Sequence, residues 1–138
     1  MNLDAITTEV IISRLRETTE AMAHTLFHSG YSPILRESQD GTAGLTDDQG
    51  KVIMLGGGLL YHSVLYTKSV QSILAVYPRK TLEEGDSFVC NDPYQAGNSH
   101  VPDMVVATPV FYKSELIAFG VSVAHKADLG GLVPGSSG

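Results

Sequence analysis

Apolar side chains recur at every third or fourth position over the first part of the chain, as on one face of an α-helix. Asp4 is a typical N-cap for such a helix, and Gly30 suits a helix end in the left-handed conformation. We therefore expect a helix over residues 4–29. The side chains expected near one face of it are Ile11, Leu15, Thr18, Met22 and Leu26.

Short apolar runs and turn-forming residues follow this helix. Residues 31–37 are predicted to form an extended segment around Pro33. Residues 44–46 and 51–55 predict two paired strands, because the polar segment 47–50 between them ends in glycine and suits a tight turn.

A glycine triplet at 56–58 leads into a second apolar segment. The triplet lacks the Gly-Lys-Ser/Thr of a phosphate loop and the G-x-G-x-x-G spacing, so it predicts a backbone bend and argues against a nucleotide site. A helix over residues 61–77 is predicted next, with His62 in its first turn and Pro78 ending it. The side chains that it is expected to bury are Val64, Leu65, Ile73 and Leu74.

Three strand-like runs complete the pattern, at residues 87–91, 104–112 and 116–124. The short turn 113–114 joins the last two, which makes them neighbours in an antiparallel pair. The chain therefore predicts a mixed α/β (α+β) fold, with a largely antiparallel or mixed sheet flanked by two helices.

Composition narrows the classes of partner. Nine Lys and Arg against fifteen Asp and Glu give a net charge of -6, which argues against nucleic acid and anionic membranes, because both require a basic face. No stretch approaches the roughly 20 apolar residues of a membrane span, and the start lacks the features of a secretory signal, so we expect a cytoplasmic protein. The single cysteine, Cys90, excludes an internal disulfide and predicts ordinary strand packing. The Gly/Pro/Ser-rich end at 130–138 leads us to expect a chain that is truncated there.

The densest polar segment is the loop at residues 91–103, between two apolar strands. His100 and Asp103 lie three residues apart around a proline, so an imidazole nitrogen and a carboxylate oxygen can face one point. His125 ends the last predicted strand, and antiparallel pairing with similar arm lengths places it beside Asp103. This predicts a two-histidine, one-carboxylate site with open positions for water or substrate. The alternative is structural: a loop cap, a turn aspartate and a hydrogen-bonded strand-end histidine.

Two long motifs resemble signatures of a known family. The loop that ends at Asp103 carries N-D-P-Y-Q-A-G-N-S-H-V-P-D, which resembles the N-D-P-y-x-G-g-x-H-x-x-D signature of the hydantoinase B family. The segment from Ala124 carries A-H-K-A-D-L-G-G-L-V-P-G-S, which resembles a second signature of that family. Three shorter features match in the same order: T-x-E-V-I in the opening helix, Y-S-P-x-x-x-E-x-x-D ending at Asp40, and His62. The resemblance therefore covers essentially the whole chain.

The resemblance implies roles for individual residues. It makes His100, Asp103 and His125 the metal ligands, with Asp40 as a fourth carboxylate at or near the metal. One divalent ion is implied, and this ligand set suits Zn²⁺, Mn²⁺ or Fe²⁺. The alternative for Asp40 is a purely structural role, as a turn aspartate ahead of Gly41.

Catalytic roles are implied for Asp40, His62 and Asp128. His62 would line the substrate pocket or hydrogen-bond a ligand, unless it faces solvent at the start of its helix. Asp128 would orient His125 or shape the loop through backbone N–H groups. Asp92 and Tyr94 are expected to hold the metal loop.

The family also implies a function. Its members include acetone carboxylase catalytic subunits, caprolactamase and the C-terminal half of 5-oxoprolinase. These proteins are longer than this chain, and they act with a partner that uses ATP to phosphorylate an amide or carbonyl oxygen. The resemblance thus implies an ATP-dependent cyclic amide hydrolase of hydantoinase or oxoprolinase type. Residues 1–138 would be the N-terminal metal-site region of its catalytic subunit. That subunit would form a hetero-oligomer with a hydantoinase A-like subunit. Two departures bear on substrate choice: residues 96–99 replace a common Gly-Gly-Thr, and Lys126 replaces a frequent second histidine.

Three other functions stay open at this point. A ketone carboxylase subunit would use the metal to hold an enolate against a carboxyl donor. A non-catalytic assembly or ligand-binding module would keep the fold without turnover. A serine hydrolase is suggested by Ser122 between Gly120 and Ala124, although this segment lies inside a predicted strand, whereas a nucleophile elbow needs a strand-to-helix turn.

Overall fold

The computed structural model of the protein describes residues 4–133, and within them five strands form one antiparallel sheet in the order β2-β1-β5-β4-β3. The sheet is open at both edges, and the mixed α+β fold expected from the sequence is confirmed. The sequence did not predict the strand order. The strands are β1 (Gly41–Asp47), β2 (Val52–Gly58), β3 (Phe88–Cys90), β4 (Asp103–Tyr112) and β5 (Glu115–His125).

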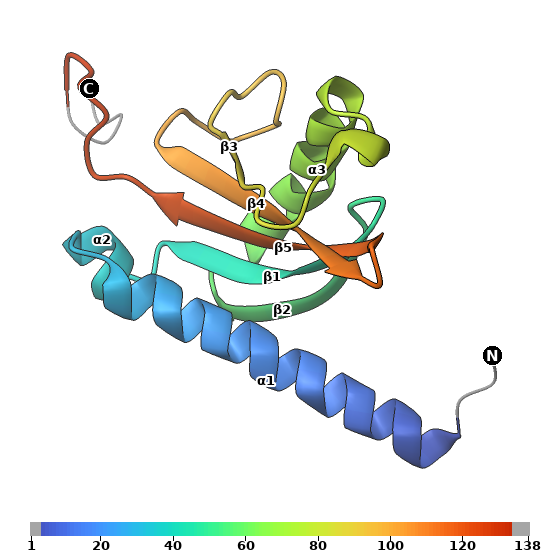
Figure 1. Cartoon of the computed structure of the whole chain (residues 1–138). Coiled ribbons are helices and arrows are strands. Elements are labelled where there is room, and N and C mark those ends of the chain that lie inside the picture. Colours follow the sequence, from blue (N-terminus) through green and yellow to red (C-terminus); the bar gives the residue numbers. More distant parts are fainter. Residues whose placement is uncertain (1–3, 134–138) are drawn as a thin grey trace.

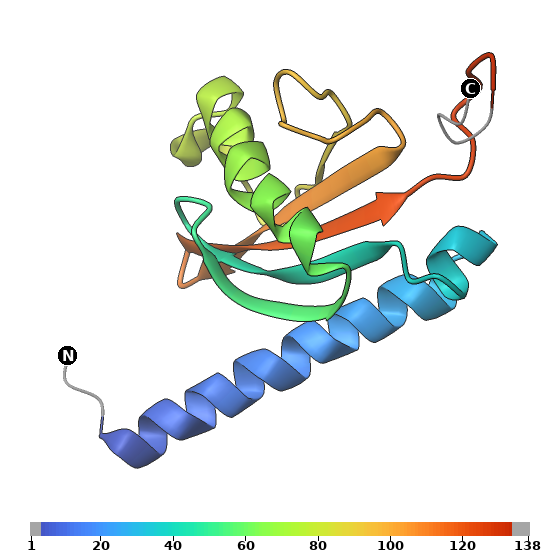
Figure 2. The ribbon, with the colours of Figure 1, turned by 180° about the vertical axis from the view of Figure 1, so that it is seen from behind.

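Helices cover the two faces of the sheet. The long α1 (Ala5–Ser29) crosses one face, where it packs on β2 and β1, and α3 (Val64–Val76) lies on the other face (Figures 1 and 2). Phe119, Val121 and Val123 alternate along β5 and pack against α3. Shorter helical turns are α2 (Pro33–Arg36), η1 (Leu60–Ser63) and η2 (Arg79–Thr81).

The start of α1 is as predicted, but its buried face is not. The Asp4 carboxylate accepts a hydrogen bond from the Thr7 backbone N–H, as an N-cap does. The buried residues are Thr19, Ala23 and Phe27, one position from the predicted stripe. The reason lies in the sheet: a Cβ at Gly56 of β2 would lie 2.2 Å from the Thr19 carbonyl oxygen, so this glycine lets the helix approach there.

Four local predictions are wrong. Gly30 ends α1 in an extended conformation, with φ −71° and ψ 140°. The segment after it is helical over Pro33–Arg36, because Ser32 caps a turn that has proline at its first position, where the missing N–H costs nothing. The glycine triplet belongs to β2, and only Gly58 has a positive φ, of 100°. Val64 begins α3 but is 72% exposed.

The remaining elements agree with the pattern. Gly44 pairs with Leu55 and Thr46 with Val52, which confirms the predicted hairpin. The strand-like runs form β3, β4 and β5, and Ser122 lies inside β5, away from any strand-to-helix turn. Cys90 is half-buried in β3. Within residues 4–133, no helix combines the length and the apolar character needed to cross a membrane.

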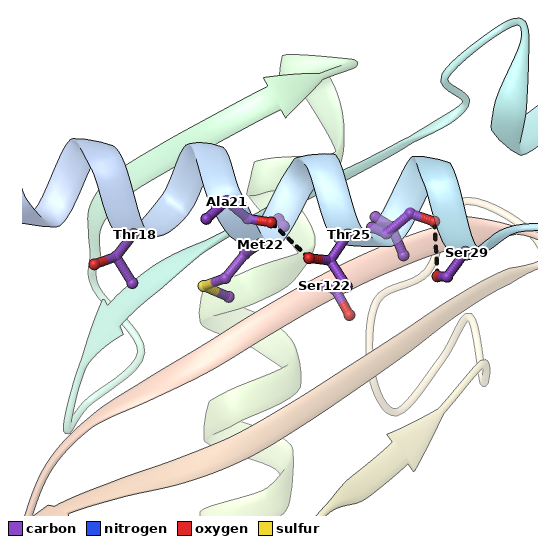
Figure 3. Close-up of a pocket in the computed structure, with 8 residues that line it drawn as sticks. Thr18, Ala21, Met22, Thr25, Ser29 and Ser122 are labelled. Carbon is purple, nitrogen blue, oxygen red and sulfur yellow. Dashed lines mark hydrogen bonds between the residues drawn. The ribbon is translucent and has the colours of Figure 1, made fainter.

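A groove of about 670 Å³ runs between α1 and the sheet (Figure 3). Its lining includes Met22 and Leu26 and has no charged side chain. The Thr25 and Ser29 hydroxyls donate hydrogen bonds to backbone carbonyls of α1, so they are already paired (Figure 3). The titratable cluster described next lies elsewhere.

Candidate metal centre

Three neighbouring strands bring polar residues together at one end of the sheet. Asp103 begins β4, His125 ends β5, and Asp40 directly precedes β1. Asp103 and His125 are paired across the antiparallel ladder, and the His125 N–H donates to the Asp40 carbonyl oxygen at 3.0 Å. The predicted juxtaposition of Asp103 and His125 is therefore confirmed.

Two imidazoles converge on one oxygen of Asp103. His100 Nε2 lies 3.1 Å and His125 Nδ1 lies 3.2 Å from Asp103 Oδ1. One possible ligand atom from each of the three residues falls within 4.8 Å of the others. The side chains of His125 and Asp103 are buried, whereas that of His100 is 39% exposed, so the cluster is approached from the His100 side.

Asp40 and His62 complete the polar cluster; the Asp40 side chain is 25% exposed. Asp40 Oδ2 lies 3.9 Å from His125 Nδ1, and Asp40 Oδ1 lies 3.7 Å from His62 Nε2. His62 is fully buried, which excludes the solvent-facing alternative that its place at a helix start had left open. The sequence associated these two residues with the site only through the family resemblance; the fold places them there.

Hydrogen bonds among its own residues and to Asp103 hold the loop before β4 in place. Asn98 donates a hydrogen bond to the Asp103 carbonyl oxygen, and the Ser99 hydroxyl donates to Asp103 Oδ2. Asp92 accepts hydrogen bonds from the N–H groups of Tyr94 and Gln95, so it shapes the loop as expected. In the sequence, Ser99 stands out only as one of the departures from the family pattern. Its position four residues before Asp103, beside a candidate ligand, was the available signal.

Two predicted residues take no part in this cluster. The Tyr94 side chain is 93% exposed, so only its backbone N–H contributes to the loop. Asp128 is exposed, and its carboxylate accepts a hydrogen bond from the Gly130 N–H at 2.8 Å. It therefore shapes the loop after β5, one of the two roles expected for it. The Pro-Gly-Ser end of the second motif lies outside the described residues.

The electrostatics of the cluster favour an ionised carboxylate. Burial by itself raises the pKa of the Asp103 carboxyl, but the Ser99 hydrogen bond and the imidazoles of His100, His62 and His125 outweigh it, and the pKa lies below its ordinary value. An ionised carboxylate beside imidazole nitrogens is the donor set of catalytic sites for divalent transition metals. Asp40 Oδ1 and both ring nitrogens of His62 are buried without a hydrogen-bond partner among the described residues. The residues present therefore fit a cation.

The fold and the cluster together define a class: an α+β protein with a histidine and carboxylate centre at the end of its sheet. Comparison with known proteins gives the family. A family model described as hydantoinase B/oxoprolinase matches residues 4–138, and the chain belongs to this family.

The relatives are longer proteins. A putative D-/L-hydantoinase subunit of Pseudomonas sp. (strain NS671) is 36% identical over 144 residues, which span 99% of this chain and 23% of that protein. A solved nucleotide-free structure of acetone carboxylase superposes with a TM-score of 0.82 at 25% identity, over 96% of this chain and 18% of that one. The ATP-dependent caprolactamase of Pseudomonas jessenii superposes with a TM-score of 0.76 at 26% identity, over 98% and 23%. The chain thus spans about a quarter or less of these relatives.

Proposed function

We propose that this chain carries the metal centre of the catalytic subunit of an ATP-dependent cyclic amide hydrolase. The observation that supports this most directly is the convergence of His100 and His125 on Asp103 at the end of β4 and β5. In this proposal the three side chains hold one divalent cation, and Asp40 approaches it as a fourth ligand through Oδ2. Zn²⁺, Mn²⁺ and Fe²⁺ all suit these donors.

The chemistry needed for a cyclic amide fits such a centre. A divalent cation supplies Lewis acidity and makes a water molecule nucleophilic near neutral pH. The protein's own residues hold its ligands: Ser99 fixes Asp103, and the β4–β5 pairing fixes His125 against Asp103. The half-exposed side chain of His100 stands at the open side, where a substrate would enter.

The names of the relatives support the substrate class and the partner. Hydantoin, oxoproline and caprolactam are all cyclic amides, and the caprolactamase is ATP-dependent. The hydantoinase relative is named as one subunit of its enzyme, which implies a second subunit in that enzyme. We propose that the partner of this chain is a hydantoinase A-like subunit that uses ATP to phosphorylate the amide oxygen, and that residues 1–138 form the N-terminal, metal-binding region of the catalytic subunit.

A ketone carboxylase is the second candidate. The superposition on acetone carboxylase, with its TM-score of 0.82, favours it. The cation held by His100, Asp103 and His125 would then supply Lewis acidity toward a ketone substrate. An assay with an ATP-using partner separates the two: loss of a lactam or hydantoin ring supports the hydrolase, whereas bicarbonate-dependent consumption of acetone supports the carboxylase.

Metal content tests the centre directly. We expect about one divalent metal ion per chain by elemental mass spectrometry, and its loss in a His100→Ala/His125→Ala double variant. The matched control is His24→Ala/His28→Ala, which removes two exposed, stacked histidines of α1. Equal metal content in both double variants would contradict the proposed ligands.

A further inference from the structure

His62 is placed beside Asp40 by the backbone. It lies in η1 directly after β2, and the Leu59 N–H donates to the Gly41 carbonyl oxygen at 2.8 Å. The His62 N–H donates in turn to the Leu59 carbonyl oxygen at 3.1 Å. The turn that carries His62 is therefore anchored to the first residue of β1, whose neighbour in the chain is Asp40.

The imidazole of His62 faces two carboxylates without forming a hydrogen bond to any described residue. It is fully buried, and neither ring nitrogen makes a hydrogen bond among the described residues. Buried polar atoms in native proteins are normally paired, so an unpaired ring that faces a polar cluster requires an explanation. Its Nε2 lies 3.7 Å from Asp40 Oδ1 and 3.8 Å from Asp103 Oδ2.

The hydrogen bonds of the two carboxylates decide between these partners. Asp103 Oδ2 already accepts a hydrogen bond from Ser99, and Asp103 Oδ1 faces His100 and His125. Asp40 Oδ1 is buried and has no partner among the residues that the structure describes. Reducing its 3.7 Å separation from His62 Nε2 to the ordinary N–H···O distance of about 3.0 Å needs only a small side-chain movement.

The orientation of Asp40 follows from that contact. Asp40 presents Oδ1 to His62 and Oδ2 to His125, the last residue of β5. A neutral imidazole with its proton on Nε2 can donate to Oδ1, whereas a proton on Nδ1 would leave a buried donor unpaired and turn the Nε2 lone pair toward two carboxylates.

We infer that His62 is a positioning residue: its Nε2–H donates to Asp40 Oδ1 and so directs Asp40 Oδ2 at the cation of the proposed metal centre. This inference rests on the proposed function, and it gives His62 a role through Asp40 in place of contact with substrate. Hydrogen bonds to ligating carboxylates typically contribute a factor of about 10 to 100 in metal affinity.

The first test needs no metal. Long-range ¹⁵N–¹H NMR spectra of the metal-free protein report which ring nitrogen of His62 carries the proton and whether that proton is held in a hydrogen bond. We expect the proton on Nε2, with a downfield, slowly exchanging signal that persists in Asp40→Asn, whose amide oxygen still accepts, and disappears in Asp40→Ala. A proton on Nδ1, or a signal that ignores Asp40→Ala, would overturn the inference.

The second test uses Zn²⁺ alone. Calorimetric titration should show binding to His62→Ala weakened about 10-fold to 100-fold at unchanged stoichiometry, and largely restored in His62→Gln, whose amide N–H₂ reaches the place of Nε2. Loss of stoichiometric zinc in both variants would overturn the positioning role in favour of direct ligation, and unchanged affinity in His62→Ala would overturn it as well. A wild-type protein that binds no zinc would refute the proposed function, while the NMR spectra still decide whether His62 holds Asp40.

Discussion

Asp103 begins β4 and His125 ends β5, and the two residues face each other across the antiparallel ladder with His125 Nδ1 3.2 Å from Asp103 Oδ1. Both side chains point to the face of the sheet that α3 covers, because they continue the alternation of Val105 and Val123. The backbone hydrogen bonds of the ladder fix the distance between the two residues, because a paired strand moves less than a loop. The centre is thus built on the most extensively paired strands of the described sheet.

Ser99 should be needed for tight metal binding at the proposed centre. Ser99→Ala removes the hydrogen bond to Asp103 Oδ2, so we expect zinc affinity to fall by a factor of about 10 to 100, measured by calorimetric titration. Ser87→Ala is the matched control, because the Ser87 hydroxyl shares a hydrogen bond with the Thr108 hydroxyl, away from the cluster. Equal zinc affinities for the two alanine variants would show that the loop holds Asp103 without Ser99.

Gly58 should not tolerate even an alanine side chain. It has a φ of 100°, and a Cβ there would lie 2.1 Å from the Gly41 carbonyl oxygen, which accepts the hydrogen bond from Leu59. Gly85 has a similar φ of 97°, but a Cβ there would meet no described atom within 4 Å, so Gly85→Ala should cost only the backbone strain of about 1–2 kcal/mol. We expect Gly58→Ala to lower the free energy of unfolding clearly more, as measured by urea denaturation. If Gly58→Ala lowered the free energy of unfolding no more than Gly85→Ala does, the end of β2 would be able to shift away from Gly41.

Tyr66 should make the fold sensitive to alkaline pH. It is fully buried, and burial raises the pKa of its phenol far above the unfolded value of about 10. A raised folded pKa means that the stabilisation is fully present below about pH 10 and is lost as the pH rises toward the folded pKa.

Absorbance titration of the six tyrosines, followed together with circular dichroism, tests this prediction. In the wild type, the last phenolate should form only as the protein unfolds. Tyr66→Phe should lack that step and lose less stability above pH 10, whereas Tyr112→Phe, at a 60% exposed position, should behave like the wild type. Early ionisation of all tyrosines in the folded protein would contradict it.

Sequence periodicity was enough for most elements and for one essential contact. The turn at Lys113 and Ser114 separates two apolar runs of similar length, and antiparallel pairing then requires Asp103 and His125 to meet. The start of α1 at Asp4 was equally predictable, because capping depends on neighbours in the chain. The misplaced features, such as the exposed Val64 and the extended Gly30, lie at element ends, where tertiary contacts select among local conformations.

The α+β class, the hairpins, and the meeting of His100, Asp103 and His125 could be predicted from the sequence, because they depend on local periodicity and on the short connections between elements. Three-dimensional packing was needed to establish that α1 buries Thr19, Ala23 and Phe27, since that choice rests on how closely Gly56 allows a helix to approach the sheet. Packing also brings Asp40 and His62 into the same polar cluster: β1 pairs with β5, a strand about eighty residues further along the chain, and no local pattern specifies which distant strand becomes a neighbour.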